Sequence, residues 1–201
     1  CLSTKWFAQR VFTVSYDQRQ LIHDKLGIPL DKIGVTYNGW EHMAKVQPDE
    51  SIFERMSAVK KGEYFYALGS LAGHKNFKWI REVARRNPDK TFVVAGGKDL
   101  RAFGDDTEAK DTHNVFYPGY VSDAENAALM KHCRLFLHPA VFEGFGIPPL
   151  EALALGAPIA LAKASCLPEL YGDTARYFDP YDYEVDLDAL AARPVAPPDK
   201  V

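Results

Sequence analysis

Short apolar runs recur along the chain and alternate with segments whose apolar residues follow a helical spacing. Several runs are apolar at every position, which is typical of strands covered on both faces of a sheet. They predict strands at Val11–Ser15, Ile33–Tyr37, Tyr64–Leu68, Phe92–Ala95, Val115–Tyr117, Leu135–His138, Ile159–Ala162 and Arg176–Phe178.

Helix-start signals lie between these runs. Ser15 is followed three residues later by Gln18, and Ser122 is followed in the same way by Glu125. Each pair has the spacing of a capping box, in which two side chains satisfy free amides of the first turn. The pair Pro148-Pro149 also suits a helix start, because the first turn has no carbonyl partners for its amides.

The alternation of strands and helices predicts the fold class. It favours an α/β, Rossmann-like parallel sheet with helices on both faces. We expect one such domain over residues 11–183, preceded at 1–10 by a remnant of an upstream half or interdomain connection and followed by a tail at 184–201. The polar stretch 96–113 is expected to form a long loop or a lid-like insertion.

Composition excludes several classes of function. The 201 residues carry a formal charge of −3 and no basic stripe, which argues against nucleic-acid binding. No apolar run approaches the roughly 18–20 residues of a membrane span. Three cysteines, an odd and sparse number, favour a reducing cytoplasm. The chain begins with Cys1 within an apparent element, so we expect that an upstream half is missing.

The loop from Pro139 to Pro149 carries the strongest chemical signal. Two glycines surround Phe145 just before a predicted helix, and glycine lets a backbone approach a ligand closely. Free amides at a helix start bind anions, and diphosphate fits such a site. Glu143 and Glu151 flank this corner and are suited to accept sugar or ribose hydroxyls. The alternative is two solvated glutamates, because this spacing alone is common.

Two further loops are candidates. In the loop at residues 66–77, Lys75 precedes a predicted helix and can reach a phosphate as a compact charge, with His74 as a further donor. The alternative is an ordinary surface lysine. In "YPGYVSD", Tyr120 and Val121 are expected to pack a base, although an ordinary strand-to-helix connection is nearly as plausible. The acidic pair Asp186 and Asp188 reads as a helix start, so no metal site is predicted.

Taken together, these motifs are familiar. "FEGFGIPPLEALALGAPIALAKASCLPELYGD" resembles the donor-binding signature of glycosyltransferase family four, a retaining group with a GT-B fold. "VFTVSYDQRQLIHDKLGIPLDKIGVTYNG" and "YPGYVSDAENAALMKHCRLFLHPA" fall in the same order as in the family, so that the resemblance covers residues 8–182.

The resemblance implies a role for each residue of the main loop. The chain would be the C-terminal, nucleotide-sugar-binding half of a GT-B fold. Glu143 would contact the transferred sugar and Glu151 the ribose. The backbone of Gly144, Phe145 and Gly146 would hold the diphosphate or sugar.

The resemblance also implies roles for residues of the second and third loops. Lys75 would neutralise the diphosphate, and Tyr120 and Val121 would pack the base. Many members carry arginine where this chain has Ser70, so Lys75 would be the principal cation, assisted by His74. This variant is similar to mannosyl- and rhamnosyl-type enzymes of bacterial surface polysaccharides, which favours GDP-mannose as the donor, with UDP-sugars next.

The implied enzyme is a metal-independent hexosyltransferase of polysaccharide biosynthesis. Its acceptor-binding N-terminal half is absent from this chain, which we expect to be inactive alone. The full-length protein would be cytoplasmic, with any peripheral contact to the inner face of the membrane made through that half. Two alternatives stay open at this point: a stand-alone nucleotide-sugar-binding module, or another GT-B enzyme such as an epimerase or phosphorylase.

Overall fold

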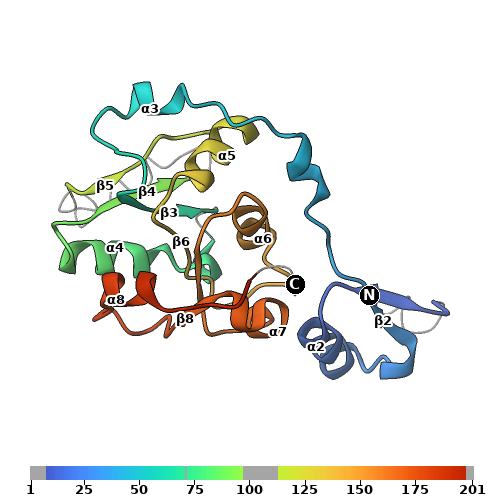
Figure 1. Cartoon of the computed structure of the whole chain (residues 1–201). Coiled ribbons are helices and arrows are strands. Elements are labelled where there is room, and N and C mark those ends of the chain that lie inside the picture. The colour runs from blue at the N-terminus through green and yellow to red at the C-terminus, as the bar shows by residue number, and fades with distance from the viewer. Residues whose placement is uncertain (1–7, 71, 97–112, 198–201) are drawn as a thin grey trace.

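A computed structural model describes residues 8–70, 72–96 and 113–197. Its centre is a six-stranded sheet in the order β5-β4-β3-β6-β7-β8, with every neighbouring pair parallel (Figure 1). The strands are β3 (Tyr64–Leu68), β4 (Thr91–Ala95), β5 (Val115–Phe116), β6 (Leu135–His138), β7 (Ile159–Ala162) and β8 (Arg176–Phe178). The α/β, Rossmann-like fold class is confirmed.

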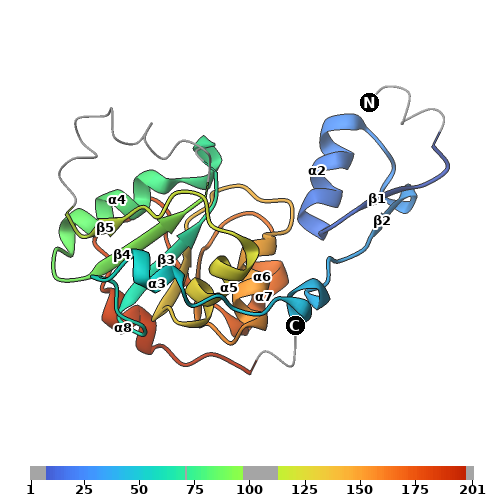
Figure 2. The ribbon, with the colours of Figure 1, turned by 90° about the horizontal axis from the view of Figure 1, so that it is seen from above.

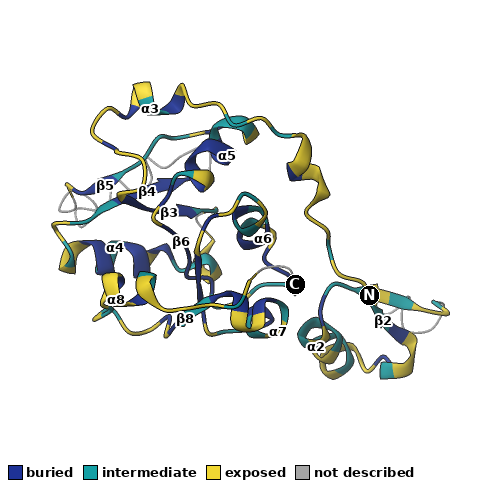
Figure 3. Ribbon diagram, viewed as in Figure 1, coloured by how far each residue is buried: buried dark blue, intermediate teal, exposed yellow. Residues whose placement is uncertain are grey.

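Helices cover both faces of this sheet. Helices α5 and α6 lie on one face, and α4 and α8 lie on the other (Figure 1). The helices from residue 52 onward are α3 (Ile52–Arg55), α4 (Phe77–Arg86), α5 (Asp123–Lys131), α6 (Ile147–Ala154), α7 (Leu167–Tyr171) and α8 (Leu187–Ala192). Because helices shield both faces, the central strands are buried almost throughout, as their continuous apolar runs predict (Figure 3).

The sheet order defines where a ligand can approach. Strands β3 and β6 are hydrogen-bonded neighbours at its centre, with Tyr66 opposite Phe136. From β3 the chain continues outward to β4, whereas from β6 it continues outward in the other direction to β7. Loops that leave the carboxyl ends of two such strands diverge and open a crevice, which is the usual ligand position in doubly wound folds. The predicted Lys75 and Glu143 loops follow these two strands.

The first two strands do not belong to this sheet. Strands β1 (Val11–Thr13) and β2 (Ile33–Val35) pair with each other in a separate two-stranded sheet. Figure 2 shows this sheet and α2 (Tyr16–Leu26) to one side of the six-stranded sheet. The expected domain over residues 11–183 therefore contains two separate sheets. The sequence did not show this, because local patterning identifies strands but not the sheet that each one joins.

Two helix starts were predicted from capping boxes. At α5 the box is complete, because the Ser122 hydroxyl accepts from the Glu125 amide while the Glu125 carboxylate accepts from the Ser122 amide. At α2 only half is present. The Ser15 hydroxyl accepts from the Gln18 amide, but the Gln18 side chain turns to the Asp17 carboxylate and to a distant backbone carbonyl.

The end of the chain is more ordered than a tail. Helix α8 buries Leu187 and Leu190 in the main hydrophobic core. The chain just before α8 is also held in place. The Trp79 indole of α4 stacks on Phe178 with ring centroids 4.1 Å apart and donates a hydrogen bond to the carbonyl of Asp182. The expected tail from residue 184 therefore includes a packed helix. The predicted loop at 96–113 lies mostly outside the described residues.

Candidate functional site

The predicted anion-binding corner has an open backbone. Gly146 caps α6 with a φ of 87°, a left-handed conformation that favours glycine, and a Cβ there would lie 2.9 Å from the Leu167 side chain. Pro148 and Pro149 occupy the first turn, as predicted. Among the described residues, none accepts a hydrogen bond from the amides of residues 144–146. These amides therefore stay available to an anion at the positive end of the helix.

Glu143 and Lys75 meet beside this corner. The Lys75 Nζ lies 2.5 Å from the Glu143 Oε1, and both side chains are largely buried. A buried histidine, His138 at the end of β6, brings its Nε2 to 2.9 Å from the same oxygen. The sequence predicted the first two residues, and the crevice between β3 and β6 brings them together.

The surroundings of Glu143 keep it ionised. Burial raises the pKa of this carboxyl, but hydrogen bonds from His138 and Lys75 outweigh burial, so that the pKa falls below its usual range. Burial also lowers the pKa of His138, against the opposing effect of Glu143. The arrangement at neutral pH is a carboxylate that accepts hydrogen bonds from an ammonium and a neutral imidazole.

The backbone of Glu143 is also fixed. Its carbonyl lies 3.0 Å from the Ser165 hydroxyl, 3.2 Å from the Gln18 side-chain amide and 3.3 Å from the Cys166 thiol. The Ser15 hydroxyl donates to the neighbouring Gly144 carbonyl at 2.8 Å. The start of α2 therefore contacts the corner directly.

A carboxylate of the large sheet region also meets the start of α2. Glu169 of α7 accepts hydrogen bonds from the backbone amides of Tyr16 and Asp17, each at 2.8 Å. A negative charge at a helix start is favourable. This contact joins the β1–α2–β2 segment to the region that carries the corner.

The Lys75 loop is held against the Glu143 loop by its backbone. Lys75 ends a short 3-10 helix at Gly73–Lys75, and the His74 carbonyl accepts a hydrogen bond from the Val141 amide at 2.9 Å. The side chains of His74 and Ser70 are exposed. Both residues therefore lie in the loop that carries Lys75, but of the three only Lys75 reaches Glu143 in the described part of the chain.

Glu151 lies one turn inside α6 and has a different partner. Its Oε1 is 2.9 Å from the Nε2 of His42, which belongs to the 3-10 helix Glu41–Lys45 in the segment between the two sheets. The side chain of His42 is 50% exposed, whereas that of Glu151 is 17% exposed. The pairing of Glu151 thus depends on a surface side chain.

The two candidate residues of the third predicted loop differ in exposure. Tyr120 is 75% exposed, whereas Val121 is 8% exposed and packs in the main core. The side chain of Val121 therefore lies in the interior, whereas that of Tyr120 is open to solvent.

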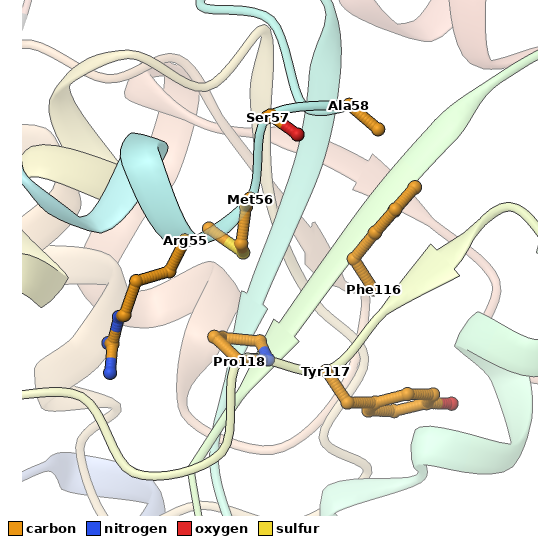
Figure 4. A pocket seen from close by; sticks show the side chains of 7 residues that line it. All are labelled: Arg55, Met56, Ser57, Ala58, Phe116, Tyr117 and Pro118. Atoms are coloured by element: carbon orange, nitrogen blue, oxygen red, sulfur yellow. The ribbon is translucent and has the colours of Figure 1, made fainter.

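Two cavities border these loops. One of about 270 Å³ adjoins the corner and is lined by Tyr37, Asn38, Trp40, Phe145, Leu150, Glu169, Leu170 and Tyr171. The other, of about 370 Å³, lies between the segment after α3 and the end of β5 and is lined by Arg55, Met56, Ser57, Ala58, Phe116, Tyr117 and Pro118 (Figure 4). The guanidinium in this second lining is already paired with Glu125, so that cavity offers little to a diphosphate.

Sequence reasoning missed several residues of the site. His138 was seen only as the end of a strand, although a titratable residue at the carboxyl end of a buried strand is itself a site signal. Ser15 and Gln18 were seen only as helix caps. His42 and Ser165 carried no signal, because only the tertiary fold brings them to the two glutamates.

Metal-ligand clusters and membrane-spanning helices are both absent from the described residues. These residues contain no group of three or more His, Cys, Asp and Glu side chains placed to hold a metal ion. None of the described helices combines the length and apolar character that a membrane crossing requires.

The chain is similar to a known protein family and to characterised members of it. The family model described as glycosyl transferases group 1 matches residues 48–191. Escherichia coli O-antigen chain mannosyltransferase B is 40% identical over 200 residues, covering 92% of this chain and 50% of that protein. Salmonella typhimurium O-antigen chain mannosyltransferase RfbU is 28% identical over 180 residues, covering 87% of this chain and 48% of that protein.

Solved structures agree on the fold. Anabaena HepE in complex with UDP-glucose superposes with a TM-score of 0.75 at 18% identity, covering 93% of this chain and 54% of that one. The α/β, Rossmann-like fold is therefore that of about half of this longer protein. The chain spans about half the length of the curated relatives it matches. Because the family model covers well over half of the 201 residues, the chain belongs to the group 1 glycosyl transferases.

Proposed function

We propose that this chain is the donor-binding half of a retaining hexosyltransferase of glycosyltransferase family four. The observation that carries the proposal is the ion pair between Lys75 and Glu143 beside the open amides that start α6. A cation, free amides and an ionised carboxylate match the diphosphate and hydroxyl groups of a nucleotide sugar.

The relatives favour a mannosyl donor. The two relatives described above are named as O-antigen mannosyltransferases, and HepE was solved with UDP-glucose. We therefore propose GDP-mannose as the first donor to test and a UDP-sugar as the second, for transfer to a hydroxyl of a surface polysaccharide.

The proposed reaction develops negative charge on the leaving diphosphate. The transition state has oxocarbenium character, so the sugar becomes positive as its bond to phosphate breaks. Lys75 and the amides of residues 144–146 stabilise the leaving group, and removal of one preorganised donor of this kind costs roughly 10²–10³ in rate. These groups supply the positive charge that a metal provides in other transferases, so we propose that the reaction is metal-independent.

The remaining roles follow from position. Glu143 binds a hydroxyl of the transferred sugar, and Glu151 binds the ribose. Tyr120 and the backbone near Val121 contact the base, and Ser70 and His74 assist Lys75 at the phosphates. Each role is a hypothesis drawn from the family resemblance and from the placement described above.

We also propose that a further half, which binds the acceptor, completes the enzyme. Helix α2 has no buried residue among those described, and the start of this helix contacts the Glu143 loop. We therefore propose that the segment β1–α2–β2 belongs with that other half and that residues from about 48 onward form the donor domain. The complete enzyme acts in the cytoplasm, and any membrane contact is peripheral and made by the other half.

A thermal-shift panel tests the proposal most directly. A ligand that binds only the folded state raises its melting temperature. We expect GDP and GDP-mannose, or UDP and a UDP-sugar, to raise the melting temperature of the full-length protein, with no loss of the shift in EDTA. The absence of a shift with every nucleoside diphosphate and nucleotide sugar would overturn the proposed function.

A further inference from the structure

His138 is a buried titratable residue that the proposed function does not use. It ends β6, is 2% exposed, and lies at the carboxyl end of the sheet where the Glu143 loop begins. Its ring lies nearly parallel to that of Phe136, with centroids 6.4 Å apart. Burial of an imidazole without a polar partner is costly, and here the partner is the carboxylate of Glu143.

The two donors to Glu143 share one oxygen. Lys75 Nζ and His138 Nε2 lie 2.5 Å and 2.9 Å from Oε1. In the described part of the chain, no group donates to Oε2. A carboxylate oxygen has two lone pairs, so Oε1 is saturated by its two donors while Oε2 can accept a hydroxyl.

The protonation of the imidazole follows from its partner. Glu143 is an acceptor because its pKa lies below the usual range, and the pKa of His138 is lowered by burial. A neutral imidazole that faces a carboxylate carries its proton on the facing nitrogen, which is Nε2. His138 is therefore a neutral donor that adds no charge to the site.

Lys75 and His138, which both donate hydrogen bonds to Glu143, respond differently when a nucleotide sugar binds. The ammonium of Lys75 is a flexible point charge that a diphosphate attracts strongly. The imidazole of His138 is fixed by β6 and by its packing, and a neutral ring is not drawn toward a phosphate. When Lys75 turns toward the diphosphate, His138 is the contact that keeps Glu143 in place.

We propose that His138 is a positioning residue that holds Oε1 of Glu143, so that Oε2 receives a hydroxyl of the donor sugar while Lys75 serves the diphosphate. This inference rests on the proposed function, because it requires a nucleotide sugar at the α6 corner. It assigns to His138 the discrimination between a nucleotide sugar and the bare nucleotide.

Three variants of the full-length protein test the assignment. His138→Gln keeps an N–H donor close to the position of Nε2, whereas His138→Leu removes the donor at similar volume. His138→Phe also removes the donor but keeps a ring beside Phe136, and it replaces the leucine variant if that one does not fold. Isothermal titration with GDP and GDP-mannose, or with the UDP pair if those bind, gives the ratio of the two affinities.

We expect the Leu or Phe variant to bind the bare nucleotide within about 2-fold of the wild type. Its preference for the nucleotide sugar should fall about 10-fold, the effect of losing a hydrogen bond that positions a charged group. The Gln variant should recover most of the preference, and kcat/KM for the nucleotide sugar should follow the same order. An unchanged preference in the Leu or Phe variant would overturn the inference. An equal loss in the Gln variant would also overturn it, because that indicates packing alone.

The design separates this inference from the proposed function. If the wild type binds no nucleotide and no nucleotide sugar, the proposed function fails and the inference fails with it. If the wild type binds both and the variants keep its preference, only the role of His138 is wrong.

Discussion

The two glutamates that flank the α6 corner lie in contrasting surroundings. Glu143 is held by Lys75 and by the buried His138, and its backbone carbonyl accepts from Gln18 of α2 and from the adjacent Ser165 and Cys166. Glu151 is held in the described structure by His42, a half-exposed side chain on a connecting segment. One carboxylate is positioned by the core of the sheet, whereas the other contacts a partner that can leave.

This difference indicates a division of work. A group that acts on the transition state must already be in position, because reorganisation during the reaction costs rate. A group that only binds the ground state can exchange a weak internal partner for the ligand. We therefore expect Glu143 to determine turnover and Glu151 to determine affinity.

The largest expected effect is that of a substitution at Glu143, the carboxylate held by the core. In the full-length enzyme, Glu143→Gln removes the charge but keeps the shape, and we expect kcat to fall about 10²–10³-fold. The fall should exceed the change in KM for the donor, which we expect to be about 10-fold because the contact with the sugar hydroxyl is also weakened. Steady-state kinetics with the donor identified by thermal shift measures both constants.

The matched control is Glu54→Gln, which neutralises an exposed glutamate of α3. It should leave both constants close to those of the wild type. If Glu143→Gln raises KM and leaves kcat unchanged, the assignment of Glu143 to the transition state is wrong.

The next effect concerns Glu151. We expect Glu151→Ala to weaken binding of the bare nucleoside diphosphate about 10-fold, which corresponds to the loss of one hydrogen bond to a charged group. Turnover at saturating donor should change little. Isothermal titration with the nucleotide measures the affinity, and unchanged nucleotide binding contradicts a ribose contact.

The sequence predicted the start of α6 correctly because its signals are local. Glycine on each side of Phe145 and the two prolines act within one turn of chain, and six of the eight predicted strands join the main sheet. Lys75 was also recognised, because its loop follows one central strand as the Glu143 loop follows another.

The sequence could not predict the partners that set the chemistry. His42, Ser165 and Gln18 are separated from the glutamates that they contact by 109, 22 and 125 positions, and no local pattern encodes such contacts. The same limit applies to β1 and β2, since strand patterning does not specify which sheet a strand joins. It applies also to Val121, because its loop sequence does not show that its side chain lies in the core.

A pH experiment sharpens the description of the buried side of the site. Burial lowers the pKa of His138, so the unfolded chain binds a proton at an imidazole pKa of about 6.5 that the folded chain resists. Stability is therefore fully present above this pH and falls as the pH drops below it. Between pH 7.5 and 5.5 we expect this residue to contribute a loss of up to about 1.4 kcal/mol in the free energy of unfolding.

Urea denaturation of the wild type and of His138→Gln at the two pH values isolates this contribution. Glu143 remains ionised in the same interval, because its pKa lies below the usual range. His113→Gln is the control, since it removes an exposed histidine that is hydrated in both folded and unfolded states. An equal pH dependence in the wild type and in His138→Gln would contradict a buried neutral imidazole.

The smallest expected effect concerns the partner of Glu151. If His42 only occupies the carboxylate until a ribose replaces it, His42→Ala should strengthen nucleotide binding, because the ligand no longer displaces a side chain. Exposed ion pairs are worth about 0–1 kcal/mol, so the gain should be no more than about 5-fold in the dissociation constant. Isothermal titration should show this gain in the wild-type background and its absence in Glu151→Ala, where no carboxylate remains to be released. Weaker nucleotide binding by His42→Ala would instead mean that His42 contacts the ligand, and the two glutamates would then both rely on a histidine that stays in place.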